Sequence, residues 1–235
     1  MHHEALIRRV AVSGVGAVSG LGWGVEPLWE GLRAGRTAIR PFQRFDHTRH
    51  RTHLAAEVTD ATDGNVPPPS CAGLEGHPRW ERLSLADRFA LFAAAEALEM
   101  AGIEAPLEAL EAGVFFGSST GGMLESERFF SEFLRSRYRT AHLRDLVSQQ
   151  VNGPGDAVAR WFGVTGPVRT FSSACASGAL ALGAALAAVR SGEVEVAVAG
   201  GSDSLCQLTY AGFNALRSVD EEPCRPFRAG REGMS

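Results

Sequence analysis

The chain has 235 residues, of which 45% are hydrophobic and 21% charged, and its formal net charge is −4. This composition is typical of a globular protein with an apolar core, and the weak negative charge without a basic cluster argues against nucleic acid as the main partner. The N-terminal sequence MHHEALIRRV lacks the apolar stretch of a signal peptide, and the longest apolar segment, 179–189, is too short to span a bilayer, so we expect a cytoplasmic protein without a membrane partner.

Two residue types narrow the possible chemistry. The four cysteines, Cys71, Cys175, Cys206 and Cys224, form no C-x-x-C pair, which indicates free thiols in a reducing compartment. All 23 residues counted as Lys or Arg are arginine. The absence of lysine excludes a Walker A lysine and a pyridoxal phosphate Schiff base.

The N-terminal region predicts a strand, a glycine loop and a helix. The strand covers Ile7–Ser13, the loop reads GVGAVSGLGWG, and the helix covers 25–35. A dinucleotide-binding loop is the obvious alternative, but Ser19 occupies the third position of G-x-G-x-x-G and no second strand with an acidic residue follows. The glycines therefore indicate tight turning and close backbone packing.

Residues 40–80 show little periodicity and are rich in proline and histidine, which predicts an irregular, exposed excursion. His47, His50 and His53 are evenly spaced within it. An exposed basic loop explains them better than a metal site, because no further Cys or His cluster completes a ligand shell.

Downstream of residue 84, capped helices alternate with short apolar strands. Ser84 and Asp87 form a capping-box pattern at the start of a helix that Gly102 ends. We expect further elements in this order: a buried strand over 112–117, a glycine loop, a charged helix from about residue 124, a short helix over 155–163, a strand over 167–171, a helix over 176–190 and a strand over 194–200. This alternation predicts an α/β fold with a mostly parallel sheet covered on both faces.

Cys175 lies at one of the predicted strand-to-helix junctions. The helix after it is apolar nearly all round from Ala179 to Val189, which predicts a buried element whose N-terminus lies inside the protein, and Gly192 is placed to end it. A thiol at that N-terminus would meet unpaired N–H groups and the positive end of the helix dipole, which favour the thiolate. Position alone leaves a nucleophile and a small core residue equally open.

Five motifs together resemble the β-ketoacyl synthase family, the condensing enzymes of fatty acid and polyketide synthesis with the thiolase-like fold. They are VAVSGVGAVSGLGWG, GVFFGSSTGG, GVTGP, TFSSACASGALALGAALAAVRSGEVEVAVAGGSDS and AGFNALRSVDEEPCRPFRAGREGM, in the family's order. The resemblance covers essentially the whole chain. It implies one N-terminal β-ketoacyl synthase domain over residues 1–235, with only the first of the two usual halves of the fold present.

The resemblance also implies a site. Cys175 would accept an acyl group as a thioester from acyl carrier protein or coenzyme A, and its backbone amide would be one oxyanion donor. Thr120, Phe213 and Met234 match positions that line the acyl pocket in relatives. The small neighbours at 174 and 176–178 would leave room for a pantetheine arm and let the helix seat closely. No metal or redox cofactor is needed, and the strand before Cys175 would pair across the twofold of a homodimer or heterodimer.

The sequence departs from the family in two respects. Arg228 stands where relatives usually carry an Asp after the RPF triplet. The two histidines that serve decarboxylation and condensation, and the second oxyanion donor, come from the family's second half, and none of the seven histidines here follows Cys175. We therefore expect that this chain alone does not condense, and that it exposes apolar surface and is either poorly soluble or strongly self-associated.

Three alternatives stay open. A non-catalytic, chain-length-factor-like partner would fit the missing half, although such partners usually lack the nucleophilic cysteine. A thiolase shares the fold and the cysteine, but GVTGP and RPFRAGREGM favour a synthase. A hydrolase nucleophile elbow requires a glycine two positions before the nucleophile, where this chain has Ser173.

Overall fold

The structure, a computed structural model, describes residues 9–59, 74, 78, 80–137, 139–146 and 149–235. The α-helices are α1 (Val25–Arg33), α2 (Leu85–Ala101), α3 (Met123–Arg135), α4 (Gly153–Trp161), α5 (Ser177–Ser191) and α6 (Gln207–Ala215). The strands are β1 (Val18–Ser19), β2 (Gly22–Trp23), β3 (Arg40–Pro41), β4 (Leu54–Ala55), β5 (Ala112–Gly117), β6 (Val168–Phe171) and β7 (Val196–Gly201). Short 3₁₀ turns cover Trp80–Arg82, Leu107–Ala109, Leu143–Leu146 and Ala174–Ala176, the last of which we call η5.

The central sheet confirms the predicted parallel arrangement. Its strands lie in the order β6-β5-β7, and both neighbours run parallel to β5. Val114 of β5 is in register with Val168 of β6 and Val198 of β7. All six residues of β5 are buried, as expected for a middle strand covered on both faces.

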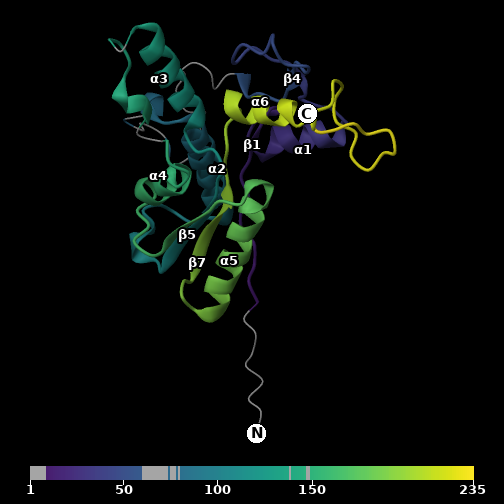
Figure 1. The fold of residues 1–235 in the computed structure, drawn as a ribbon. Coiled ribbons are helices and arrows are strands. Elements are labelled where there is room, and N and C mark those ends of the chain that lie inside the picture. Colours follow the sequence, from purple (N-terminus) through teal and green to yellow (C-terminus); the bar gives the residue numbers. More distant parts are fainter. Residues whose placement is uncertain (1–8, 60–73, 75–77, 79, 138, 147–148) are drawn as a thin grey trace.

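Helices cover both faces of this sheet, which makes three layers (Figure 1). Successive side chains of a strand point to opposite faces. Val114 and Phe116 of β5 therefore join a core with α2 and α4, whereas Phe115 between them packs with Ala185 of α5. The alternation within one short strand thus holds all three layers together.

The predicted helix ends are confirmed. Ser84 accepts the Asp87 N–H and the Asp87 carboxylate accepts the Ser84 N–H, which completes the capping box of α2. Gly102 and Gly192 follow α2 and α5 in the left-handed conformation, with φ of 66° and 78°. Glycine suits both positions because a Cβ disfavours positive φ.

The predicted N-terminal strand is wrong for the residues that can be assessed. Residues 9–17 form no strand, Val12 is 82% exposed, and residues 7 and 8 lie outside the described part. Close packing explains the glycines instead. A Cβ on Gly14 or Gly16 would lie 1.9 Å from a backbone carbonyl oxygen of α2. The chain passes across a helix there, so its backbone meets no neighbouring strand within the described residues.

The excursion is irregular as predicted, but its first part, residues 40–59, is only partly exposed. β3 and β4 pair antiparallel, and Phe42 and Thr52 are 3% and 1% exposed. The Thr52 hydroxyl donates to Asn214 Oδ1 at 2.9 Å and lies 2.9 Å from the Tyr210 hydroxyl, which ties this segment to α6. The remaining excursion at 60–73, 75–77 and 79, with Cys71 and His77, lies outside the described residues.

Two of the three evenly spaced histidines contact each other. His47 Nδ1 lies 2.9 Å from His53 Nδ1, and the His47 ring stacks on Phe42. His50 instead packs edge-on against Tyr210. Among the described residues no group of three or more His, Cys, Asp or Glu side chains is arranged to hold a metal ion.

The expectation of a buried helix after Cys175 is wrong for much of α5. Small residues face the sheet, with Ala181, Ala185 and Ala188 buried, whereas Leu180 and Leu182 are 48% and 56% exposed. An alanine face seats the helix closely on the sheet and leaves the longer side chains on the outer face. The packed partner, and not the composition of the helix, decides which side is buried.

The segment Ala174–Ser191 also corrects the expectation that no stretch is long enough to cross a bilayer. Its mean hydropathy is 1.4 over 18 residues, of which 22% are buried, so length and composition alone permit a membrane span. Core helices of globular proteins meet the same criterion, and one face of α5 packs on β5 and β7.

Candidate active site

Three loops meet at one edge of the sheet. Because β5, β6 and β7 are parallel, their carboxyl ends lie together, and the segments 118–122, 172–176 and 202–206 follow them (Figure 1). The Ser118 N–H donates to the carbonyl of Phe171 and the Ser202 N–H to that of Gly117. This edge is where parallel α/β sheets bind their ligands.

Cys175 lies in the middle of η5, directly before α5, and its side chain is exposed. The predicted junction is confirmed. The expectation that the N-terminus of α5 lies inside the protein holds for Ser177, which is buried, but not for residues 174–176, which are exposed. Ala174, the residue before the thiol, has φ of 47°. A left-handed conformation costs a residue with a Cβ about 1–2 kcal/mol, so the surrounding contacts must hold it.

Two serine hydroxyls hold the Ala174 carbonyl. Ser177 Oγ donates to it at 2.7 Å and also accepts the Ser173 N–H at 2.8 Å. Ser119, from the loop after β5, donates its hydroxyl to the same carbonyl at 3.2 Å and lies 3.2 Å from Ser177 Oγ. The turn that carries Cys175 is therefore held by one serine of α5 and by one serine of the loop after β5.

The loop after β5 is held in turn by Asp203, from the loop after β7. One carboxylate oxygen, Oδ1, accepts four hydrogen bonds: from Ser118 Oγ at 3.0 Å, the Ser119 N–H at 2.9 Å, the Thr120 N–H at 2.7 Å and Thr120 Oγ1 at 2.9 Å. The predicted pocket residue Thr120 thus uses its hydroxyl within this network.

Sequence reasoning missed Ser119 and Asp203 as parts of the site, although the motifs SSTGG and GGSDS contain them, and it assigned Ser177 only a role as a small neighbour of Cys175. The signal was available. Polar residues that directly follow parallel strands converge at one edge of the sheet. Applied to the loops after β5 and β7, that rule places the serine-rich segment beside Asp203.

Close packing at this edge depends on Gly117 more than on the glycine next to the thiol. A Cβ on Gly117 would lie 2.4 Å from the carbonyl carbon of Ser177, whereas a Cβ on Gly178 would meet nothing within 4 Å. The predicted close packing of the helix is therefore made possible by a glycine of the strand, Gly117, and not by a glycine of the helix.

Comparison with known proteins places this arrangement in a family. The sequence profile described as "Beta-ketoacyl synthase, N-terminal domain" matches residues 7–235, which is nearly the whole chain. The chain belongs to the β-ketoacyl synthase family.

Individual relatives agree. The chain is 35% identical over 97% of its length to a Streptomyces halstedii protein named as a polyketide β-ketoacyl synthase, of which it covers 55%. It is 29% identical over 97% of its length to 3-oxoacyl-[acyl-carrier-protein] synthase 2 of Coxiella burnetii, again covering 55% of that protein. The solved ishigamide ketosynthase/chain length factor superposes on 96% of the chain with a TM-score of 0.82 at 27% identity, and 55% of that chain is covered.

These similarities confirm the thiolase-like α/β fold of ketosynthases. They also confirm that the chain corresponds to the N-terminal half of the family, because it matches the N-terminal domain and spans about half the length of the curated relatives it matches.

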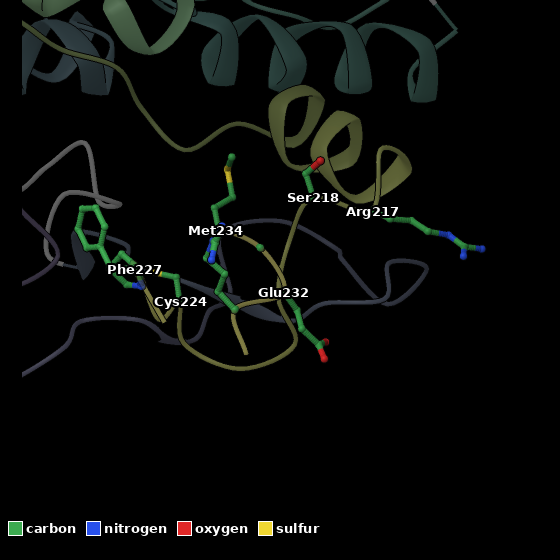
Figure 2. Close-up of a pocket in the computed structure, with 9 residues that line it drawn as sticks. Arg217, Ser218, Cys224, Phe227, Glu232 and Met234 are labelled. Atoms are coloured by element: carbon green, nitrogen blue, oxygen red, sulfur yellow. The ribbon is translucent and has the colours of Figure 1, made fainter. Parts of the chain in front are cut away.

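The other two predicted pocket residues of the synthase domain, Phe213 and Met234, lie together in a group of residues near the end of the chain, apart from the Cys175 turn. Phe213 belongs to α6 and is 36% exposed, and Met234 is 47% exposed near the end of the chain. Ser218 joins them, because its N–H donates to the Phe213 carbonyl and its carbonyl accepts the Met234 N–H. Met234 lines an open hollow with Cys224 and Phe227 (Figure 2). No interaction found among the described residues joins Phe213 or Met234 to the Cys175 turn, so their pocket role stays a prediction.

The described thiols of the synthase domain differ in access. Cys206 is fully buried before α6, and burial raises the pKa of its thiol. Its sulfur lies 2.8 Å from Thr209 Oγ1. Cys224 is half-buried, whereas Cys175 is exposed. Of these three cysteines, Cys175 is the most exposed.

Proposed function

We propose that this domain carries the acyl-accepting cysteine of a β-ketoacyl synthase. The observation that supports it best is the exposed Cys175 at the strand-to-helix junction. It directly follows Ala174, whose backbone is left-handed and whose carbonyl accepts hydrogen bonds from two serines. Such a turn presents a thiol and its backbone N–H to a substrate at the ligand-binding edge of the sheet.

The first half-reaction is an acyl transfer. The Cys175 thiolate attacks the carbonyl carbon of an acyl thioester, a new C–S bond forms, and the carbonyl oxygen takes up the negative charge. Collapse of this intermediate expels the thiolate of the carrier, which takes up the proton that Cys175 released. The Cys175 N–H stabilises the oxyanion, and such a donor contributes a factor of roughly a hundred to a thousand in rate.

The second half-reaction is decarboxylative condensation. A malonyl thioester loses carbon dioxide, and the resulting carbanion attacks the acyl group on Cys175 to give a β-ketoacyl thioester. The developing enolate needs donors that Cys175 cannot supply, and no histidine follows Cys175 in these 235 residues. We therefore propose that the 235-residue chain transfers acyl groups but does not condense without further chain or a partner.

The partner in this proposal is acyl carrier protein, with the domain paired as a homodimer or heterodimer in the cytoplasm. The name of the Coxiella burnetii relative includes the acyl carrier protein, and the ishigamide structure includes a chain length factor. Edge strand β6, with Val168 exposed, is free for pairing within the described sheet. Neither a metal nor a redox cofactor is required by the two half-reactions.

The test is intact-mass detection of acylation. The chain is incubated with acetyl and hexanoyl thioesters of coenzyme A and of acyl carrier protein, beside the Cys175→Ala variant and a Cys224→Ala control. We expect one acyl adduct on the wild type and on Cys224→Ala, and none on Cys175→Ala. Addition of malonyl thioester should release no carbon dioxide.

Three outcomes would overturn the proposal. An adduct that persists in Cys175→Ala would place acyl transfer on another nucleophile. A folded wild type that takes up no acyl group would favour the non-catalytic, chain-length-factor-like partner, whose test is co-elution with an active synthase. Cleavage of acetoacetyl coenzyme A would instead indicate a thiolase.

A further inference from the structure

We propose that Asp203 is a positioning residue for acyl transfer, because through Ser119 it fixes the peptide between Ala174 and Cys175 and so aims the Cys175 N–H. This inference rests on the proposed function, in which Cys175 accepts the acyl group. Asp203 itself contacts neither the sulfur nor the oxyanion.

The peptide geometry gives the first step. The carbonyl of Ala174 and the N–H of Cys175 belong to one planar, trans peptide and point in opposite directions. Whatever holds the carbonyl therefore sets the direction of the N–H. Ser177 and Ser119 both donate to that carbonyl.

Ser119 depends on Asp203 for its own position. The Ser119 N–H donates to Asp203 Oδ1 at 2.9 Å, and its two neighbours, Ser118 and Thr120, donate to the same oxygen. Hydrogen bonds to a charged acceptor are stronger than those between neutral groups. One carboxylate thus fixes three consecutive residues of the loop after β5.

The strained backbone explains why this support matters for the rate. Ala174 holds φ of 47°, a conformation that a residue with a Cβ keeps only where its surroundings impose it. Without Asp203, the loop loses its common acceptor and Ser119 moves away from the Ala174 carbonyl. The hydroxyl and N–H of Ser177 then hold that carbonyl alone, and the peptide can tilt further. A tilt moves the N–H away from the oxygen that develops charge, while the thiol stays exposed.

Two reactions of the same sulfur separate positioning from general reactivity. Attack on a thioester develops an oxyanion and needs the N–H, whereas alkylation by iodoacetamide displaces iodide at a saturated carbon and develops none. We expect Asp203→Ala to lower the rate of Cys175 acylation by hexanoyl coenzyme A about tenfold to a hundredfold, the scale of a misplaced catalytic group. The rate of Cys175 alkylation should change less than about threefold, because no oxyanion donor acts in it.

Graded variants and matched controls sharpen the test. Asp203→Asn keeps an acceptor oxygen and should restore most of the acylation rate. Ser119→Ala, which removes the hydroxyl through which Asp203 acts on the carbonyl, should lower the acylation rate about as much as Asp203→Ala. Two controls remove the same chemistry elsewhere: Ser191→Ala at the far end of α5, and Asp46→Ala, whose carboxylate accepts a backbone N–H and a hydroxyl from Thr48. Both should acylate like the wild type.

The outcomes are distinguishable. Equal acylation of the wild type and Asp203→Ala would overturn this inference and leave the proposed function intact. Acylation and alkylation that fall together, or rapid labelling of buried Cys206 in Asp203→Ala, would show general loosening of the fold and also overturn it. A folded wild type that is alkylated at Cys175 but takes up no acyl group would overturn the proposed function and this inference with it.

Discussion

At Gly117, the last residue of β5, the sheet comes closest to the helix that follows the candidate nucleophile. A Cβ there would lie 2.4 Å from the Ser177 carbonyl carbon and 2.5 Å from the Gly178 nitrogen. Both contacts are with backbone, which no rotamer change can relieve. The first turn of α5 and the η5 turn before it can therefore keep their positions only if residue 117 has no side chain.

Gly117→Ala should accordingly destabilise the domain by about 1–3 kcal/mol, the usual cost of overpacking, and should lower the rate of Cys175 acylation. Urea unfolding followed by tryptophan fluorescence measures the first effect and intact mass the second.

The matched control is Gly183→Ala in the middle of α5, where a Cβ would meet nothing within 4 Å. Its stability should rise by up to about 1 kcal/mol, because alanine is the better helix former. Similar loss of stability in both variants would contradict the close approach at Gly117.

At the scale of elements, carboxylates on one helix cap the start of another. Glu96 of α2 accepts the Val25 N–H at the start of α1, and Glu125 of α3 accepts the Leu85 N–H at the start of α2. Glu127 of α3 accepts two N–H groups at the start of α6. The first N–H groups of a helix lack partners within it, so these contacts fix the order of helices in space.

Glu125 gives a pH prediction. Burial raises the pKa of its carboxyl above the ordinary value of 4.5 and outweighs the hydrogen bond from the Leu85 N–H. Its other oxygen is buried and has no hydrogen-bond partner among the described residues. A raised pKa in the fold means that the stabilising contribution is complete below the unfolded pKa and is lost as pH rises through the folded one. Glu125→Gln keeps an acceptor for Leu85 and cannot ionise.

The Glu125→Gln variant should therefore gain stability relative to the wild type as pH rises above about 4.5, with the difference levelling off above the folded pKa. Denaturant unfolding at several pH values from 5 to 8 measures this difference. A wild type that grows more stable than the variant with rising pH would show that the ionised carboxylate is the favoured form.

At the scale of the molecule, the outer face of α5 leaves leucines in contact with solvent on the described surface. Leu180, Leu182 and Leu186 are 48%, 56% and 37% exposed, and the edge residue Val168 is 39% exposed. Large contiguous apolar patches mark surfaces that associate. We therefore expect the isolated chain to self-associate through α5.

The double variant Leu182→Glu and Leu186→Arg should be more monomeric than the wild type in sedimentation velocity over a concentration series. Its stability should change by less than about 0.5 kcal/mol, because exposed sites tolerate substitution and the new pair is spaced i,i+4 on a helix. Ala185→Glu, on the face against the sheet, is the control that should unfold the domain. Unchanged association of the double variant would exclude this face.

Local patterns determined the elements and the place of the candidate nucleophile. The capping box at Ser84, the glycines that end α2 and α5, and the apolar strand β5 follow from backbone geometry within a few residues, so the sequence predicted them. The short-range pattern also placed Cys175 at a strand-to-helix junction, and five motifs identified the family. The glycines at 14 and 16 were assigned to close packing for the right reason.

Only the tertiary structure decided which surfaces these elements bury and which residues meet. α5 is apolar on all sides, but within the described structure only its alanine face is buried. Burial depends on which elements pack against a helix and not on its composition alone. Phe42 and Thr52 are buried by α6, a helix far along the chain. Asp203 and Ser119 meet because parallel strands bring their loops to one edge. The sequence indicates that polar loops gather there, but the strand order that makes β5 and β7 neighbours comes from the tertiary structure.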